Sequence, residues 1–486
     1  MTKNNNLAFF RFRNIGKDVL LTSASGGWMI LGQSDFDDFV GGKDIAKKEV
    51  KNELVVKGFY KTDDKKILDL AGEYLRMNQS AMSGPSLFIL VLTARCNHRC
   101  LYCQATPESH QSNGYNMTQI TAKKTIDVLF NTPSQGIGIE LQGGEPLLNW
   151  PVLKFIVKYA RELNKEVKKD LKISLVSNLT LIDEEKMKFL EENRVNISCS
   201  FDGPKNIHNK NRVYLEDGNS YDAVVKKIKY IQGVIKLNRK KSEEKHIDRL
   251  NAILTVSRFS LPHAKEIIDE YIKCDFTNIF LRPLSPIGLA KQHIDVIGYK
   301  IEDFIDFYKE AMDYILKLNS EGLLFVERMS FLALKKVLQG TDSGYLEMRS
   351  PCGAGIGQMA FDYDGRVYTC DEGRMAKKMG YDNFQIGNVN ESRYNDLIDN
   401  DVTKTTCLSS VLDGHVSCMN CAYKPYCGTC PLINFMEYGT LFPQLSNTDR
   451  CKMNKAMFDY LFLKLKNKKY RKIFEKWFER HEEDVK

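Results

Sequence analysis

A repeated alternation of strand and helix between residues 87 and 284 limits the folds open to this chain. Short, nearly continuous apolar segments have the length of buried strands, and longer amphipathic stretches typical of helices separate them. The six apolar segments span residues 88–93, 136–142, 172–178, 195–201, 250–256 and 278–284. This pattern predicts a parallel sheet covered by helices. Six repeats fall short of a closed eight-unit barrel, so the period alone leaves two α/β folds open, an open barrel and a doubly wound sheet.

The segments outside this alternation predict further domains, since 486 residues exceed one ordinary core. Residues 1–80 mix strand-like and helical runs, which predicts a small α+β domain of winged-helix type. Two apolar helical stretches within residues 301–344 predict a helical bridge. Residues 345–451 contain short strands and turns. Residues 452–486 predict an amphipathic basic helix that caps the fold or, alternatively, contacts a partner or a membrane surface.

Composition and charge place the chain among soluble globular proteins. Hydrophobic residues make up 43% of it and charged residues 27%. The sequence shows neither a signal peptide nor an apolar run of roughly 20 residues, as a membrane span needs, so we expect a cytoplasmic protein that binds no membrane. The net charge of +8 comes mostly from dispersed lysines. This distribution indicates a solvated surface without a nucleic-acid partner, and binding to nucleic acid or to an acidic partner is the alternative.

Thirteen cysteines are distributed unevenly along the chain. Disulfides are disfavoured in the cytosol, so clustered cysteines predict metal or redox sites. Cys199 and Cys274 lie apart from the others and are expected to pack in the core. The remaining cysteines form two groups, one at 96–103 and one at 352–451.

Cys96, Cys100 and Cys103 have the spacing C-x3-C-x2-C directly after the first predicted strand. Parallel sheets build their sites at this C-terminal edge. Three thiolates can hold three irons of a four-iron cluster and leave the fourth iron for a small molecule. A zinc site needs a fourth ligand, and His98, the nearby candidate, lies inside the loop. The spacing therefore favours an iron–sulfur cluster over zinc.

This spacing, with Tyr102 before the last cysteine, resembles the signature of the radical S-adenosylmethionine (radical SAM) superfamily. Three later segments are also similar to family segments: QGGEP at 142–146, SLVSNLT at 174–180 and SCSFDGPKNIHNKNR at 198–212. The resemblance implies a partial (β/α)6 barrel of TIM type over residues 86–300, with a 4Fe-4S cluster and S-adenosylmethionine (SAM) as cofactors. It also implies that one electron from the cluster splits SAM into methionine and a 5′-deoxyadenosyl radical.

The resemblance further assigns cofactor-binding residues to the ends of the strands. They are Tyr102, Gly143, Gly144, Glu145, Ser177, Asn178, Ser200, Arg212 and Leu284. A guanidinium at position 212 suits the carboxylate of the cofactor, because its planar fork binds both oxygens. Outside this family context, the glycine pair would indicate only a turn, and Arg212 would be a surface residue.

The second cysteine group resembles the SPASM extension of peptide-modifying radical SAM enzymes. Two cysteines flank a predicted hairpin, a C-x2-C-x5-C-x2-C quartet follows, and one more cysteine ends the group. The resemblance implies two auxiliary 4Fe-4S clusters, and thus three clusters in all. The implied ligands of one are Cys418, Cys421, Cys427 and Cys451. The implied ligands of the other are Cys352, Cys370 and Cys430.

The chain departs from the SPASM pattern in two places. The last gap of the quartet is x2 where the family has x3, and one expected cysteine near Cys352 is missing. The second auxiliary cluster is therefore expected either to have an open iron or to be closed by Cys407. Paired C-x2-C units also fit a zinc ribbon over residues 418–430, which stays open as an alternative.

Asp371 directly follows Cys370. In the sulfatase-maturating relatives that this region resembles, an aspartate at the matching position acts as the base toward the substrate. The resemblance therefore implies a catalytic role for Asp371, buried beside a cluster. The alternative is an aspartate that caps the turn of the hairpin.

Longer strings, among them FLRPLSPIG and CAYKPYCGTCP, are similar to the His-Xaa-Ser-system radical maturases. These enzymes act on ribosomally made peptides, so the resemblance implies an oxidoreductase that abstracts hydrogen from a precursor peptide and forms a crosslink or another oxidative modification. It also implies a reducing partner such as flavodoxin or ferredoxin, and binding of a leader peptide by residues 1–80. Two other functions remain open: sulfatase maturation, which converts Cys or Ser to formylglycine, and electron transfer by an iron–sulfur carrier.

Overall fold

The computed structural model of the chain describes residues 6–43, 45, 47–61, 64–241, 250–342, 344 and 348–485. The chain forms two compact units. The barrel unit contains Ser83–Met329 and Ala354–Cys407, and the terminal unit contains Met1–Met82, Ser330–Gly353 and Leu408–Lys486. The region predicted as the auxiliary-cluster domain, 345–451, therefore contributes residues to both units.

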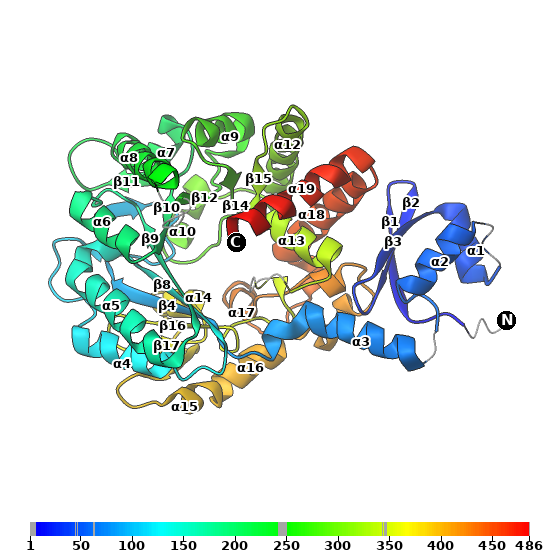
Figure 1. Ribbon diagram of the computed structural model, residues 1–486, viewed down its shortest axis with the longest axis horizontal. Helices are drawn as coiled ribbons and strands as arrows, with labels where there is room; N and C mark the ends of the chain where they lie inside the picture. The colour runs from blue at the N-terminus through cyan, green and yellow to red at the C-terminus, as the bar shows by residue number, and fades with distance from the viewer. Residues whose placement is uncertain are drawn as a thin grey trace. The chain divides into compact units, whose positions relative to one another are not determined.

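The barrel unit is built on a nine-stranded sheet with the order β14-β12-β10-β9-β8-β4-β16-β17-β18 (Figure 1). Seven of its strands are parallel to one another, and six of these overlap the six predicted segments. They are β4 (Leu87–Thr93), β8 (Gly136–Gly143), β9 (Asp170–Ser177), β10 (Val195–Ser200), β12 (Leu250–Thr255) and β14 (Leu281–Arg282). Each of these six strands adds to the same side of the one before it, whereas a doubly wound sheet reverses direction at one point. The strand order confirms the partial (β/α)6 barrel.

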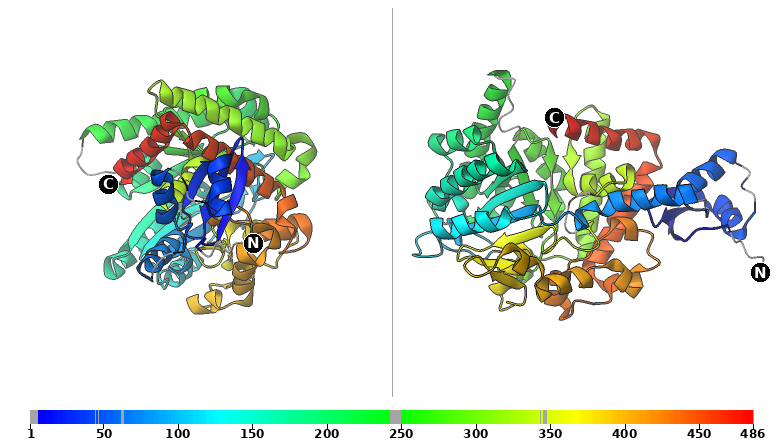
Figure 2. Two further views of the ribbon diagram at one scale, coloured as in Figure 1. Left: turned by 90° about the vertical axis from the view of Figure 1, so that its right-hand side faces the viewer. Right: turned by 60° about the horizontal axis from the view of Figure 1, so that its bottom comes forward.

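Helices follow the parallel strands and surround them from outside, as Figures 1 and 2 show. They are α4 (Gln119–Leu129), α5 (Trp150–Val167), α6 (Glu184–Glu192), α8 (Ser220–Lys241), α9 (Ala264–Lys273) and α12 (Ile301–Ser320). In α5, apolar residues recur every three or four positions, so Val152, Ile156 and Ala160 are buried on one face. This spacing is what lets the helix cover the sheet.

Side chains along β8 alternate between two faces of the sheet. Ile139 and Leu141 are fully buried. Glu140 and Gln142 point to the opposite face and are half-buried. The polar face of β8 therefore supplies side chains to the interior of the barrel.

Shorter elements shape the loops at the ends of the strands. They are β5 (Arg95–Cys96), β6 (His98–Cys100), β7 (Glu108–Ser109), η2 (Pro146–Asn149), α7 (Lys205–Asn211), β11 (Arg212–Tyr214), α10 (Leu289–Gln292) and α11 (Ile294–Ile297). The sixth predicted strand is interrupted, because β13 (Asn278–Ile279) pairs with β15 (Val326–Glu327) while β14 pairs with β12. The buried carboxylate of Glu327 accepts the N–H of Leu281 at 3.3 Å, beside this interruption.

A hairpin from the cysteine-rich region extends the barrel sheet. β16 (Gln358–Phe361) pairs in parallel with β4, and β17 (Arg366–Tyr368) and β18 (Gln385–Asn388) continue the sheet antiparallel. The sequence predicts the hairpin, but nothing in its residues indicates that it pairs with β4. The helices of this region are α14 (Asp371–Lys377), α15 (Tyr394–Ile398) and α16 (Asp401–Ser409).

The terminal unit begins with an antiparallel sheet, β1-β2-β3, and three helices. The strands are β1 (Phe10–Ile15), β2 (Asp18–Ser23) and β3 (Trp28–Gly32), and the helices are α1 (Gln33–Gly41), α2 (Lys48–Val56) and α3 (Asp64–Asn78). Figure 2 shows α1 beside the blue strands, where Phe39 of α1 and Leu54 of α2 share a core with Val19 and Leu21 of β2. The sequence does not predict α2, because it is short and buries only Leu54.

The terminal unit also contains most of α13 (Arg328–Gln339), and α17 (Pro431–Tyr438), α18 (Asp449–Leu465) and α19 (Lys468–Val485). The tail predicted as one helix over 452–486 forms two helices, α18 and α19. The side chain of Asn467 accepts the N–H of Lys469 at 2.9 Å and so starts α19. Arg13 of β1 donates two hydrogen bonds of 2.8 Å to Asp459 of α18. Among the helices of the described residues, none has the length and hydropathy to cross a membrane.

We expect Phe462→Ala to lower the free energy of unfolding of the terminal unit by about 3–5 kcal/mol. Phe462 is fully buried, and its ring lies 5.3 Å from that of Trp28 and 5.9 Å from that of Tyr423, so truncation leaves a cavity. Leu463→Ala is the matched control, because this neighbouring side chain is 45% exposed. Thermal unfolding followed by circular dichroism compares the variants, and an equal loss of Tm in both contradicts the expectation.

Candidate functional site

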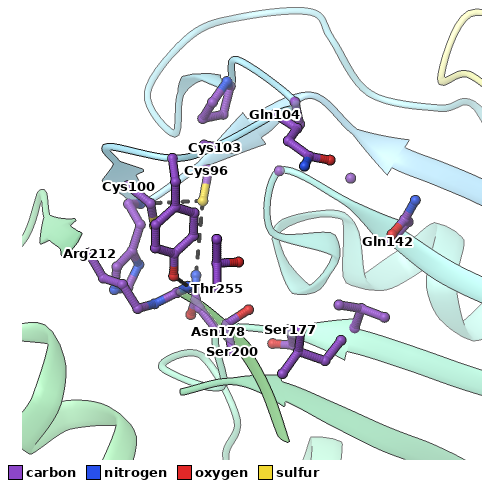
Figure 3. A pocket seen from close by; sticks show the side chains of 18 of the residues that line it. Cys96, Cys100, Cys103, Gln104, Gln142, Ser177, Asn178, Ser200, Arg212 and Thr255 are labelled. Atoms are coloured by element: carbon purple, nitrogen blue, oxygen red, sulfur yellow. Dashed lines mark hydrogen bonds between the residues drawn. The ribbon is translucent and has the colours of Figure 1, made fainter. Parts of the chain in front are cut away.

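The three cysteines predicted to hold a cluster lie on the loop that follows β4 (Figure 3). Cys96 ends β5, Cys100 ends β6, and Cys103 follows three residues later. Backbone pairing fixes this loop, since β6 pairs with β11 and places Cys100 opposite Arg212. All three cysteines line one cavity.

Burial raises the pKa of all three thiols, to about 12 for Cys100. Backbone donors oppose this effect: the N–H of His98 donates to Cys96 Sγ at 3.3 Å, and the N–H groups of Ala105 and Thr106 donate to Cys103. Buried thiols of this kind ionise when they bind a metal, and N–H···S hydrogen bonds suit an anionic cluster. The loop therefore fits an iron–sulfur cluster.

No three Cys, His, Asp or Glu side chains converge on a single ion-sized point in the described part of the chain. A cubane cluster does not require this, because each thiolate binds a different iron. His98, the candidate for a fourth zinc ligand, has both ring nitrogens in hydrogen bonds, to Asn97 Oδ1 at 3.3 Å and to Ser220 Oγ at 2.9 Å. Burial lowers its pKa to about 3, so the ring is neutral and supports the loop.

A cavity of about 200 Å³ separates the cysteines from the ends of β8, β9, β10 and β12 (Figure 3). Most of the residues predicted for the first cluster and the cofactor line it: Cys96, Cys100, Tyr102, Cys103, Gly143, Gly144, Ser177, Asn178, Ser200 and Arg212. The sequence analysis missed Gln142, Thr255, Arg282 and Met375, which also line the cavity. Alternation along β8 and β12 could have indicated Gln142 and Thr255, whereas nothing in the sequence pattern marks Met375.

Arg212 belongs to a buried network that runs beside the cysteines. Its Nη1 donates to the hydroxyl of Tyr102 at 2.7 Å, and that hydroxyl donates to the carboxylate of Asp202 at 2.7–2.9 Å. Asn211 Nδ2 donates to the same carboxylate at 3.1 Å. The sequence analysis did not identify Asp202 as part of the site.

The Nε of Arg212 is buried and has no hydrogen-bond partner among the described residues. Burial disfavours the guanidinium charge, but Cys100, Tyr102 and Asp202 outweigh burial and hold the pKa of Arg212 well above its usual value. A buried donor without a partner is rare in folded proteins. A charged guanidinium with a spare N–H beside the cavity fits the carboxylate of the predicted cofactor.

Gly143 and Gly144 lie against the backbone of the cysteine loop. The N–H of Gly144 donates to the carbonyl of Thr93 at 2.8 Å, and the N–H of Glu145 donates to that of Arg95 at 2.8 Å. A Cβ on Gly143 would lie 2.2 Å from the oxygen of Thr93, and one on Gly144 would lie 2.1 Å from that of Arg95. Gly143 also has φ +146°, which other residues rarely adopt. Only glycines allow this close approach.

Glu145 is fully buried and joins the glycine segment to the end of β9. Its carboxylate accepts Ser177 Oγ at 2.9 Å, the N–H of Asn178 at 2.8 Å and the N–H of Leu147 at 3.1 Å. Glu145 and Leu284 are not among the residues that line the cavity, and Leu284 packs in an apolar cluster with Cys100 and Tyr102. Their contacts with the cofactor stay predictions.

Asp371 is buried at the start of α14, where Cys370 Sγ caps the helix by accepting the N–H of Gly373 at 3.4 Å. Arg374 Nε donates to Asp371 at 2.8 Å and forms a buried ion pair. Asp371 does not line the cavity, so its role as a base stays a prediction. Glu140 is a carboxyl group that the sequence analysis missed: burial, and then the charge of Asp371, raises its pKa to about 7.

The cysteines assigned to one auxiliary cluster lie together in the terminal unit. They are Cys418, Cys421, Cys427 and Cys451. Burial, and then the charges of the other three thiols, raises the pKa of Cys427 to about 12, and such coupling requires that the four lie close to one another. Asn454 Nδ2 donates to Cys427 Sγ at 3.3 Å. This arrangement supports the implied ligand set.

The cysteines assigned to the other auxiliary cluster belong to different units. Cys352 and Cys430 lie in the terminal unit, whereas Cys370 and Cys407 lie in the barrel unit. The N–H of Cys352 donates to Ser410 Oγ at 2.8 Å within the terminal unit. This ligand set, with an open iron or with Cys407, stays a prediction.

We expect Glu140→Gln to stabilise the protein more at pH 8 than at pH 5.5. The raised pKa means that the folded protein retains a proton that the unfolded chain releases above pH ~4.5, so the free energy of unfolding falls as pH rises through 7. Glutamine does not titrate, so the variant is spared this loss. Its free energy of unfolding relative to the wild type is therefore about 2 kcal/mol higher at pH 8 than at pH 5.5. Thermal unfolding at the two pH values tests this against the exposed control Glu166→Gln, and a pH-independent difference contradicts it.

Two family descriptions match the chain. The radical SAM superfamily matches residues 90–239, and the iron–sulfur cluster-binding SPASM domain matches residues 352–431. The cysteine-type anaerobic sulfatase-maturating enzyme of Clostridium novyi (strain NT) is 27% identical over 356 residues, which cover 71% of this chain and 87% of that enzyme. The radical SAM cyclopropyl synthase TigE of Paramaledivibacter caminithermalis is 24% identical over 361 residues, which cover 69% of this chain and 68% of that protein.

Solved structures share the fold. Native anSMEcpe with bound AdoMet aligns with a TM-score of 0.63 at 22% identity, over 79% of this chain and 99% of that chain. SuiB of Streptococcus suis bound to the precursor peptide SuiA aligns with a TM-score of 0.52 at 14% identity, over 89% of this chain and 96% of that chain. Taken with the cysteine loop and its cavity, the two family matches show that the chain contains a radical SAM domain over residues 90–239 and a SPASM domain over residues 352–431.

Proposed function

We propose that this protein is a peptide maturase that uses SAM to oxidise a ribosomally made peptide. One observation carries the proposal: a loop of three cysteines, a glycine pair and a buried arginine with a spare N–H surround a single cavity. When the cofactors are bound, one electron splits SAM and provides a 5′-deoxyadenosyl radical that abstracts hydrogen from the peptide. Crosslinking or another oxidation follows.

The chain's own residues bind and orient the cofactors in this proposal. Cys96, Cys100 and Cys103 line the cavity and would each bind one iron of the cluster, so that the fourth iron would be free to bind SAM. The guanidinium of Arg212, held by Tyr102, binds the carboxylate of SAM. The burial of these side chains excludes water from the reacting atoms.

The proposal also includes two auxiliary clusters, which brings the number of clusters to three. Cys418, Cys421, Cys427 and Cys451 hold one, and their proximity supports this assignment. Cys352, Cys370 and Cys430 hold the other. When bound there, the auxiliary clusters would supply acceptors for the second electron of the oxidation, and a redox partner such as flavodoxin or ferredoxin would supply the first electron.

The N-terminal segment supports a precursor peptide as the substrate. Exposed apolar side chains occur on and before β1 and on α3: Phe9, Phe12, Leu68, Tyr74 and Leu75. β1 and β3 are the edges of their sheet, and a sheet edge can bind an extended peptide. We assign leader-peptide binding to residues 1–80.

Sulfatase maturation is the second candidate. The relative from Clostridium novyi is named for this activity, and Asp371 is buried beside Cys370 as the resemblance requires. The two candidates differ in product. A peptide with the pattern Cys-x-Pro-x-Arg is converted to formylglycine in one case and is left unchanged in the other, which mass spectrometry distinguishes.

We expect the anaerobically reconstituted protein to release 5′-deoxyadenosine from SAM when dithionite supplies electrons, and Cys100→Ala to abolish this release. The variant lacks one of the three ligands of the first cluster. Cys274→Ala is the matched control, because Cys274 is a buried cysteine outside the cavity. Chromatography of the nucleoside products gives the readout. A wild-type protein that has full iron content but forms no 5′-deoxyadenosine excludes the proposed function.

We expect Arg212→Gln to raise the Kd for SAM at least tenfold while the iron content stays unchanged. The substitution removes a charge-assisted hydrogen bond to the carboxylate, and bonds of this kind contribute about 1.5–3 kcal/mol. Lys210→Gln is the control, since this exposed side chain lies two residues away. Calorimetric titration with SAM measures both constants, and an unchanged Kd in Arg212→Gln removes the arginine from the binding site.

A further inference from the structure

A second cavity, of about 190 Å³, lies in the barrel unit beside the first. Gly143, Gly144 and Ala105 line both cavities. We propose that the second cavity binds a carboxylate of the substrate peptide, from an aspartate or glutamate close to the residue that is modified. This inference rests on the proposed function, because it takes a peptide as the substrate.

Basic side chains dominate the polar lining of this second cavity. The four basic residues are Arg366, Arg374, Lys377 and Lys378, and Asp362 is the one acidic residue among those that line it. Val91 and Ala94 of the first barrel strand and its loop form the apolar wall. A ligand with negative charge and a short apolar stem matches this lining.

Three of the basic side chains have buried donors without partners. Arg366 Nε, Arg374 Nη2 and Lys377 Nζ are buried and make no hydrogen bond to any described residue. Arg374 is only 6% exposed, so water is largely excluded from it. Because buried donors are almost always paired in folded proteins, three of them around one cavity indicate an acceptor that comes from another molecule.

The existing ion pairs leave these donors available. Three of the cations have an acidic partner outside the lining: the pairs are Arg366–Asp364, Arg374–Asp371 and Lys378–Glu108. Asp362 accepts the N–H of Tyr363 at 3.0 Å. A carboxylate offers up to four acceptor sites for the free donors and matches the guanidinium fork. A doubly charged phosphate would face stronger repulsion from Asp362.

The position of the cavity explains why a peptide would use it. Gly143, Gly144 and Ala105 line both cavities, so the second cavity adjoins the one that contains the cysteine loop. A peptide that places one side chain beside the cluster can therefore place a nearby acidic side chain among the four cations. The second cavity thus selects substrates by charge close to the modified residue.

Capped pentapeptides test this proposal with the reconstituted, SAM-loaded protein. Ac-Gly-Gly-Glu-Gly-Gly-NH2 has only the side-chain carboxylate, and Ac-Gly-Gly-Gln-Gly-Gly-NH2 is its neutral isostere. We expect calorimetry to show at least tenfold tighter binding of the glutamate peptide to the wild type. Lys377→Gln should reduce the ratio to near one, Lys377→Arg should retain it, and the exposed control Lys404→Gln should leave it unchanged.

Three outcomes overturn the inference. If the wild type binds the two peptides with equal affinity, the protein has no carboxylate site of this kind. If the ratio of the two affinities is unchanged in Lys377→Gln, the carboxylate site is not the second cavity. Inorganic phosphate that binds more tightly than the glutamate peptide and displaces it identifies a site for free oxyanions. The release of 5′-deoxyadenosine by the wild type is measured in parallel, so that failure of this site and failure of the proposed function are separate results.

Discussion

The close packing of Gly143 and Gly144 against the backbone of the cysteine loop is the constraint on which the site depends. Two backbone hydrogen bonds of 2.8 Å join this segment to Thr93 and Arg95, at a distance that excludes any Cβ. Glu145 then extends the connection to the end of β9 through its fully buried carboxylate. These contacts hold the ends of β4, β8 and β9 together beside the cavity.

Arg212 connects the other side of the cavity to the cysteine loop. It pairs with Cys100 through the backbone of β11 and β6, and its side chain reaches Asp202 through the hydroxyl of Tyr102. A buried positive charge is thus balanced by Asp202 while it keeps one unused donor. The same arrangement of polar groups that stabilises the loop is suited to bind an anionic ligand. Stability and binding are therefore supplied by the same few side chains.

The sequence predicted the features that depend on the spacing of nearby residues. It did not predict the features that depend on contacts between residues far apart in the chain. The length and apolar character of the segments predicted the parallel strands, and C-x3-C-x2-C predicted the loop at the first strand end. In contrast, the hydrogen bond of Asp202 to Tyr102 and the raised pKa of Glu140 arise only through the folding of the barrel around these residues. Pairing of β16 with β4 depends on complementary edges that no local pattern records. Asn467 divides the tail into two helices by a single side-chain hydrogen bond, which periodicity does not reveal.

The pairing of β16 with β4 has a consequence for how the chain is made. β4 is the first strand of the barrel to leave the ribosome, and the strand that covers its free edge is made only after all the other barrel strands. A nascent barrel therefore exposes an unpaired apolar edge during most of its synthesis, which favours misassembly between chains. A protein truncated before residue 354 would retain that edge permanently. We therefore expect chaperones to bind mainly to nascent chains that already contain the barrel strands and their helices but do not yet contain the hairpin of β16 and β17.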